Sequence, residues 1–265
     1  MDLGISGNTA VVTAGGNGLG KATAEVFVAE GVNVVINDIS QDALDAALPE
    51  LEAAAVDGAQ VRAVQGDLTD NDDIVALIET TVDTFGGLDH LVLSAGGPRS
   101  GPFMEMEDAD WQFAFDLLVM SVVRICRAAQ PHLAADAGGT IVASTSRSVK
   151  EAIPNLVLSN AVRSGVAGLA KTLAGEFAPE IRTNVVMPGP TETQRAIDLI
   201  EAAIDRGEYD SYEEAIAQKS ASIPQGRLGR PAEFGRFAVM LSSPVASYVN
   251  GTAIAIDGGA MKSNV

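Results

Sequence analysis

The chain alternates between short apolar runs rich in β-branched residues and longer segments whose apolar residues recur with helical spacing. The short runs predict seven strands, at residues 9–14, 33–37, 61–65, 90–94, 139–145, 182–187 and 253–256. Strands that alternate with helices in this way are joined by right-handed crossovers, which give a parallel sheet with helices on both faces. The pattern therefore predicts an α/β fold with a doubly wound, seven-stranded parallel sheet.

The helical spacing predicts helices at residues 19–30, 41–55, 71–85, 108–134, 159–177 and 231–241, with a further helical pair around 192–220. No repeat and no Pro/Gly linker divides the chain, so residues 1–265 are expected to form a single domain. The segment 190–225 contains charged residues and two of the three tyrosines but no strand pattern. We expect this segment to form a small helical lid over the carboxyl edge of the sheet, where a substrate would bind.

The composition is strongly acidic, with 35 Asp and Glu against 17 Lys and Arg and a formal net charge of −18. Such a surface repels nucleic-acid phosphates and anionic lipids, so neither a nucleic acid nor a membrane is expected as a partner. The first seven residues lack the features of a signal peptide, and no apolar run reaches the roughly 20 residues that span a bilayer. The single cysteine, Cys126, has no intrachain partner. These features predict a cytoplasmic protein, and the acidity suits either a salt-rich cytosol or any soluble acidic protein.

A glycine-rich turn, Thr-Ala-Gly-Gly-Asn-Gly-Leu-Gly at residues 13–20, joins the first predicted strand to the first helix. Its glycines allow backbone N–H groups and the positive helix end to meet a pyrophosphate without side-chain obstruction. Eighteen residues after Gly20 the second strand leads to Asp38, whose carboxylate can accept hydrogen bonds from ribose hydroxyls and repel a 2′-phosphate. No basic residue follows directly, so NAD is favoured over NADP. The alternative is a turn needed only for close helix–strand packing, with Asp38 as a helix N-cap.

Further short motifs follow the later strands: Asp67-Leu68, Ser94-Ala95-Gly96, Ser144-Thr145-Ser146, Pro188-Gly189 and Asp257-Gly258-Gly259. Together with the glycine turn they resemble the short-chain dehydrogenase/reductase superfamily, especially its bacterial 3-oxoacyl-acyl-carrier-protein reductase-like group, from residue 2 to about 262. The resemblance implies a Rossmann-type fold, a small-molecule substrate, and a homo-oligomer, either a tetramer or a dimer.

The same resemblance assigns the cofactor contacts to Gly15, Gly16, Asn17, Gly18, Leu19, Asp38, Asp67, Leu68, Ala95, Gly96, Arg163, Pro188, Gly189, Thr191 and Thr193. The chain departs from the family at Ala14, where the first glycine of the turn is expected. A methyl group there is tolerable only if the backbone φ of Ala14 stays negative.

Members of this superfamily move a hydride to or from a carbonyl or hydroxyl compound with an Asn, Ser, Tyr and Lys set, in which the tyrosine passes the proton. By the resemblance, Ser146 keeps the serine position, whereas Ser159, Arg163 and Leu118 replace the tyrosine, lysine and asparagine. An aliphatic hydroxyl is a far weaker acid than a phenol, and a guanidinium does not deprotonate in proteins. The candidate catalytic residues are therefore Ser146, Ser159 and Arg163, with Lys150 as a candidate substitute for the missing acid.

Two tyrosines of the predicted lid, Tyr209 and Tyr212, are further candidates for the missing acid, with a solvated side chain as the alternative in each case. Arg99 and Arg147, near the same sheet edge, are candidates for binding an anionic group of the substrate, with a surface charge as the alternative. No histidines, cysteines or acids within one element have metal-ligand spacing, so no metal is expected.

Three functions fit this sequence. The first is an NAD(P)-dependent oxidoreductase that acts on a small carbonyl or hydroxyl compound with atypical or reduced catalysis. The second is an NAD-binding pseudoenzyme that acts as a partner or sensor, because only Ser146 remains of the catalytic set. The third is a lyase resembling halohydrin dehalogenases, which place arginine where Arg163 stands but keep the tyrosine and fill the nucleotide pocket with bulky side chains. The small glycines of the turn make the third the weakest.

Overall fold

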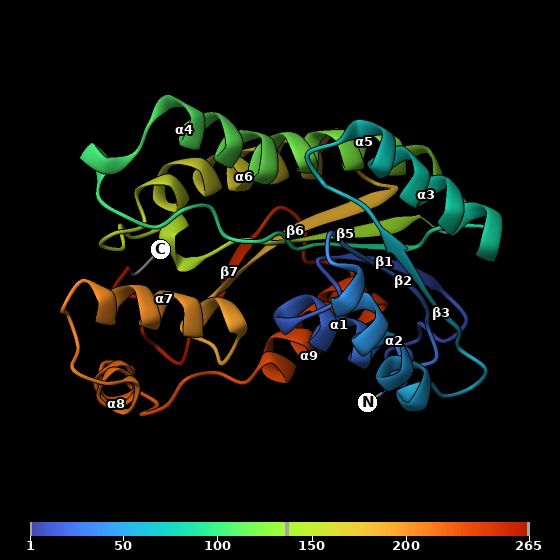
Figure 1. Cartoon of the computed structure of the whole chain (residues 1–265). Helices are drawn as coiled ribbons and strands as arrows, with labels where there is room; N and C mark the ends of the chain where they lie inside the picture. Colours follow the sequence, from blue (N-terminus) through green and yellow to red (C-terminus); the bar gives the residue numbers. More distant parts are fainter. Residues whose placement is uncertain (1, 136–137, 264–265) are drawn as a thin grey trace.

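The computed structural model describes residues 2–135 and 138–263, and its centre is one parallel sheet between two layers of helices (Figure 1). The seven strands are β1 (Thr9–Thr13), β2 (Asn33–Asp38), β3 (Val61–Gln65), β4 (His90–Leu93), β5 (Gly139–Ser144), β6 (Ile181–Pro188) and β7 (Ala253–Ile256). Their order across the sheet is β3-β2-β1-β4-β5-β6-β7, and every pairing is parallel. The predicted doubly wound α/β fold is confirmed. The order reverses between β1 and β4, which is where such folds bind nucleotides.

Helices cover both faces of the sheet (Figure 1). One face is covered by α1 (Gly18–Ala29), α2 (Gln41–Ala54) and α9 (Pro231–Ser242), and the other by α3 (Asn71–Phe85), α4 (Asp108–Phe115), α5 (Ser121–Leu133) and α6 (Val157–Glu176). Two more helices, α7 (Gln194–Asp205) and α8 (Tyr212–Ala221), form the predicted helical pair beyond the end of the sheet. No helix in the described ranges is both long enough and apolar enough to cross a bilayer.

The core has one apolar cluster on each side of the sheet, because successive side chains of a strand point to opposite faces. On β1, Val12 belongs to the cluster beneath α1 and α9, together with Phe27 and Phe234, whereas Val11 belongs to the cluster beneath α3 and α5. Cys126 lies in the second cluster, and burial raises the pKa of its thiol to about 12. This thiol is therefore part of the packing.

The single helix predicted for residues 108–134 is wrong in one respect, because a π-helical segment, Asp116–Met120, separates α4 from α5. Leu118, at the position where the superfamily has asparagine, lies on this segment and is buried against Leu158 and Val162 of α6. A π-turn inserts one residue into the helical repeat without breaking the run of apolar residues, so the periodicity does not reveal it. The segment brings α4 and its neighbour Leu117 to the edge of the cavity described next.

Candidate active site

A cavity of about 580 Å³ opens at the carboxyl ends of the strands. Its walls come from the glycine turn, from the residues that follow β2, β3, β4, β5 and β6, and from α6 and α7. One space thus joins the predicted cofactor turn to the predicted catalytic residues.

Most of the predicted cofactor residues line this cavity: Asn17, Gly18, Leu19, Asp38, Asp67, Leu68, Ala95, Gly96, Arg163, Pro188, Gly189, Thr191 and Thr193. Gly15 and Gly16 do not line it but are buried in the turn. A Cβ on Gly15 would lie 2.8 Å from the Cβ of Ile36, and one on Gly16 would lie 2.8 Å from the Cβ of Ala43. These two glycines permit close packing of the turn on β2 and α2. For Gly15 and Gly16, this is the role that the packing alternative gave to the whole turn.

Ala14 has a φ of +47°, which corrects the expectation that its backbone stays in the negative region. The turn has to reverse sharply here: the N–H of Gly15 donates to the carbonyl of Asn37 at 2.8 Å, and the carbonyl of Ala14 lies directly against Gly20. In the left-handed region a Cβ crowds the following carbonyl, at a cost of roughly 1–2 kcal/mol. Ala14 therefore holds backbone strain at the cofactor turn.

The substitution Ala14→Gly is expected to raise the free energy of unfolding by about 1 kcal/mol, since glycine adopts this φ without steric cost. The measurement is urea unfolding at neutral pH. Ala95→Gly is the matched control, because Ala95 lines the same cavity but is not among the described residues with positive φ. If Ala14→Gly lowers the free energy of unfolding as much as Ala95→Gly does, there is no backbone strain at Ala14.

Asp38 lies between the glycine turn and the cavity. Its Oδ2 accepts from the N–H of Gly16 at 3.2 Å, and its Oδ1 accepts from the N–H of Ser40 at 3.1 Å. The N-cap of α2 is Ser40, whose hydroxyl accepts from the N–H of Ala43 at 3.2 Å, so the alternative that made Asp38 the N-cap is wrong. The Asp38 carboxylate remains a wall of the cavity at the end of β2.

Two buried polar atoms on residues of the cavity wall fit a dinucleotide. Asn37 Oδ1 and Ser94 Oγ are buried with no hydrogen-bond partner among the described residues, and both residues line the cavity. Buried polar atoms are nearly always hydrogen-bonded, so orphaned ones in a cavity wall fit a site where a ligand supplies the partner. After β6, a Cβ on Gly189 would lie 2.5 Å from Asp257 Cβ. Glycine is therefore required for the backbone of this part of the cavity wall to pack against Asp257.

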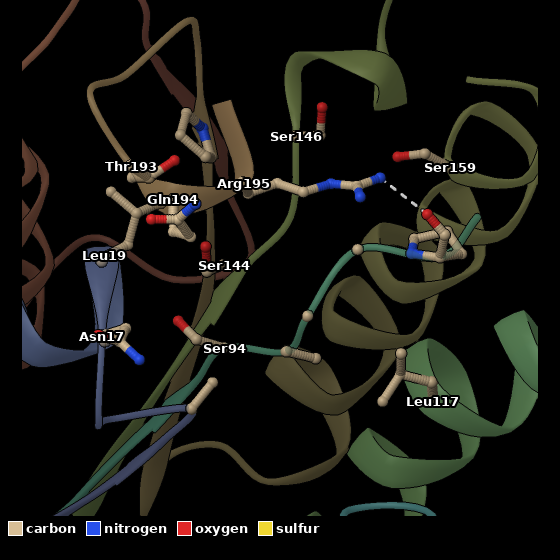
Figure 2. A pocket seen from close by; sticks show the side chains of 18 of the residues that line it. Asn17, Leu19, Ser94, Leu117, Ser144, Ser146, Ser159, Thr193, Gln194 and Arg195 are labelled. Carbon is tan, nitrogen blue, oxygen red and sulfur yellow. Dashed lines mark hydrogen bonds between the residues drawn. The ribbon is translucent and has the colours of Figure 1, made fainter. Parts of the chain in front are cut away.

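Ser146, which follows β5, and Ser159 and Arg163, both on α6, line the same cavity. Figure 2 shows the two serines. Ser146 Oγ accepts from the N–H of Ser148 at 3.1 Å, which holds the serine at the start of a short 3-10 turn. Ser159 is buried, and its Oγ lies 3.3 Å from Ser148 Oγ. Ser148 is a neighbour that the sequence did not single out, and it connects the two predicted serines.

Arg163 follows Ser159 by one helical turn on α6, and its Nη2 donates to the carbonyl of Gly96 at 3.4 Å. Burial, and then the positive charge of Arg195, lower the pKa of Arg163 to about 10. The guanidinium therefore stays protonated at neutral pH, and it contributes a fixed positive charge rather than a proton.

The structure does not bring the substitute acids to this site. Lys150 is exposed and its Nζ donates to the carbonyl of Ala253 at 3.4 Å, away from the residues that line the cavity. Tyr209 has the ammonium of Lys219 5.8 Å from the centre of its ring, and Tyr212 is exposed. Neither tyrosine lines the cavity.

The two arginines proposed to bind an anion are engaged elsewhere. Arg99 pairs with Asp110 at 2.9 Å and Arg147 pairs with Glu151 at 2.6 Å, and neither lines the cavity. Within the described residues, no three histidine, cysteine or acidic side chains are grouped so that they could hold a metal.

Arg195 is a further residue of the site that the sequence does not single out. Its side chain leaves α7 beside Thr193, the N-cap of that helix, and crosses the cavity toward Ser159 (Figure 2). Its Nη2 donates to the carbonyl of Pro98 at 2.8 Å. The side chain lies against Gly97, where an added Cβ would be 2.7 Å from Arg195 Cζ. The only signal in the sequence is its place two residues after Thr193.

The family model described as enoyl-(acyl carrier protein) reductase matches residues 13–261 of the chain. The 3-oxoacyl-[acyl-carrier-protein] reductase of Thermotoga maritima is 32% identical over 256 residues, which cover 96% of this chain and 98% of that protein. The 3beta-hydroxysteroid dehydrogenase 1 of Eggerthella lenta is 35% identical over 258 residues, or 96% of this chain and 94% of that protein.

Among solved structures, the L-sorbose reductase of Gluconobacter frateurii, complexed with NADPH and L-sorbose, superposes with a TM-score of 0.92. It is 33% identical, and the match covers 99% of this chain and 100% of that one. Reductases and dehydrogenases thus match the chain along nearly its whole length. On its motifs, its strand order and these matches, the chain belongs to the enoyl-(acyl carrier protein) reductase family of the short-chain dehydrogenase/reductase superfamily.

Proposed function

We propose that this protein is an NAD-linked oxidoreductase that transfers a hydride between the nicotinamide and a small carbonyl or hydroxyl compound, by an altered proton-transfer arrangement. The observation that carries the proposal is the single cavity whose wall includes the glycine turn, Asp38, Ser146 and Arg163. A cofactor and a reacting substrate need to share one such space, because hydride transfer requires contact between them.

The residues of the wall fit a dinucleotide in a definite direction. The N-terminus of α1 and the turn before it suit the pyrophosphate, and Asp38 suits the ribose hydroxyls of the adenosine. Pro188, Thr191 and Thr193 would then hold the nicotinamide end. When bound, the cofactor supplies or accepts the hydride. The preference for NAD rests on Asp38, which is followed by Ile39 and Ser40 rather than by a base that would pair with a 2′-phosphate.

Ser146 and Arg163 would act on the reacting oxygen. The Ser146 hydroxyl is suited to donate a hydrogen bond to the substrate oxygen, and the fixed charge of Arg163 stabilises negative charge or holds ribose hydroxyls. Ser159 is too weak an acid to donate the proton directly, so its role is a hydrogen-bonding one within the Ser148–Ser159 pair. The proton that a carbonyl takes up with the hydride, or that an alcohol releases, would then be exchanged with water at the Ser146 hydroxyl, and this chemistry predicts slower turnover than a tyrosine-bearing site would give.

Exposed apolar side chains near α4 support a homo-oligomer as part of the proposal. Phe103, Met104 and Phe115 are 63%, 88% and 45% exposed. Large apolar side chains left exposed on a segment such as this one suit a protein–protein contact.

The test is an NADH titration followed by a turnover assay with a panel of carbonyl compounds. We expect NADH binding, slow NADH oxidation with at least one compound, and a loss of about 100-fold in kcat in Ser146→Ala, since removal of one donor to a reacting oxygen costs about that much. Ser164→Ala is the matched control, because Ser164 is an exposed serine of α6 whose hydroxyl bonds the carbonyl of Asn160.

NADH binding with no turnover of any compound, and no effect of Ser146→Ala, would instead favour the pseudoenzyme. The absence of the tyrosine and the lysine from positions 159 and 163 is the observation that supports this second function. Halide release from a haloalcohol would favour the lyase.

A further inference from the structure

Two arginine side chains, from different helices, line the same end of the cavity without an acidic partner. Arg163 of α6 is 9% exposed, and its hydrogen bond goes to the carbonyl of Gly96. Arg195 of α7 is half-buried and donates to the carbonyl of Pro98. Across residues 2–135 and 138–263, neither arginine forms an ion pair within 4 Å; Asp198, one turn along α7, is hydrogen-bonded by Gln194 instead. The hydrogen bonds of both guanidinium groups therefore go to neutral carbonyl groups, and the charge of Asp198 acts on Arg195 without forming an ion pair.

The charged residues of the cavity wall are separated along the order of the strands. Of the acids, Asp38 is the last residue of β2 and Asp67 follows β3. The arginines instead contact the loop after β4, at Gly96 and Pro98, on the other side of β1. The acidic end suits uncharged hydroxyl groups, and the basic end suits an anion.

The direction of Arg195 separates a substrate anion from the phosphates of the cofactor. The glycine turn, with Asn17 and Leu19, is where a pyrophosphate would lie. The Arg195 side chain extends away from these two residues and toward Ser159 (Figure 2). Its guanidinium therefore reaches the end of the cavity where the reacting oxygen would lie.

We infer that the substrate of this site carries an anionic group, of which a carboxylate is the best match, and that Arg195 together with Arg163 binds it. A guanidinium presents a planar fork of donors that pairs with both oxygens of a carboxylate. Leu117, Leu156 and Leu199 line the same cavity, so the rest of the substrate has an apolar body. This inference rests on the proposed function, because it names the substrate class of the same site.

The positive charge of Arg195 contributes, after burial, to the lowered pKa of Arg163, so the two guanidinium groups repel each other. Burial lowers the pKa of Arg195, and the charge of Asp198 partly offsets that lowering. An anion between them relieves this repulsion. The arrangement is therefore expected to bind an acid more tightly than its uncharged analogue of the same shape.

The test compares benzoate with benzamide, which have the same shape and differ in charge, by isothermal calorimetry with and without saturating NADH. We expect the wild-type protein to bind benzoate at least about tenfold more tightly than benzamide, because hydrogen bonds to charged groups contribute that much. In Arg195→Gln the ratio is expected to fall to the smaller preference for benzoate that the charge of Arg163 gives by itself. Arg206→Gln is the matched control, because Arg206 lies at the other end of α7, where its Nε pairs with Glu208 at 2.7 Å.

Equal binding of the two probes to the wild-type protein, or an unchanged ratio in Arg195→Gln, would overturn the inference. A tenfold weaker NADH affinity in Arg195→Gln with an unchanged probe ratio would assign Arg195 to the cofactor instead. Thermal unfolding of both variants checks that they are folded. A different result, the absence of NADH binding or of turnover, would contradict the proposed function. The ratio of benzoate to benzamide affinity can be measured without NADH, so the two failures are distinguishable.

Discussion

Replacing Ser159 with tyrosine and Arg163 with lysine together is expected to raise the kcat of carbonyl reduction by about 100-fold or more. Residues 159 and 163 lie one turn apart on α6, and both line the cavity that Ser146 also lines. A phenol ionises near pH 10, and a neighbouring ammonium brings that value closer to neutral pH. A positioned general acid contributes about 10²- to 10⁴-fold to the rate. The measurement is steady-state NADH oxidation with the carbonyl compound on which the wild-type protein is most active.

The matched control is the double variant Ser159→Phe with Arg163→Lys, which has the same aromatic ring and ammonium but no phenolic hydroxyl. Any gain caused by filling the cavity or by the change of cation appears equally in both double variants. If the tyrosine variant is no faster than the phenylalanine variant, the low reactivity has its origin elsewhere, for example at the buried Leu118 that replaces a polar residue.

The substitution Asp38→Asn is expected to shift the ratio of NADH to NADPH affinity by about 10- to 100-fold in favour of NADPH. The carboxylate repels a 2′-phosphate and accepts strong hydrogen bonds from ribose hydroxyls, and the isosteric amide loses both effects. The measurement is the dissociation constant of each nucleotide by fluorescence titration. Because the amide has nearly the same shape, Asn at position 38 is expected to leave the fold intact.

Asp45→Asn is the control for a general loss of negative charge, because Asp45 is an exposed carboxylate of α2 that accepts from Gln41 and does not line the cavity. An affinity ratio that stays the same in Asp38→Asn would remove Asp38 from the cofactor site. An equal shift in both variants would assign the effect to the overall charge of this region.

The sequence predicts the elements of this fold well because its periodicities are long and regular. Strands β3 and β7 and helix α3 begin and end at the predicted residues, and the other predicted strands differ by one residue at one end or, for β6, at both ends. The π-helical segment at Asp116–Met120 lies outside the reach of this pattern, since its apolar residues continue the helical face. The backbone of Ala14 also differs, because residue type gives only a preference for negative φ, and the hydrogen bond of Gly15 with β2 overrides it.

The positions of site residues that belong to a motif are predictable from the sequence. The contacts of long charged side chains are less predictable. Asp38, Ser146 and Ser159 come to one cavity because each follows a strand end or sits at the start of a helix. The charged side chains are different. Arg99 and Arg147 lie near the expected edge but meet Asp110 and Glu151, and such pairings depend on the course of loops that periodicity does not describe. Arg195 is found only once α7 is placed.

The close contact of Arg195 with Gly97 sets the pose of the arginine. A Cβ at residue 97 would overlap the Nε and Cζ atoms of Arg195 in its present pose. Because the guanidinium is the far end of a flexible side chain, alanine at position 97 would displace it and leave the backbone in place. Position 97 therefore decides where in the cavity the positive charge of Arg195 lies, without changing how much charge the cavity holds.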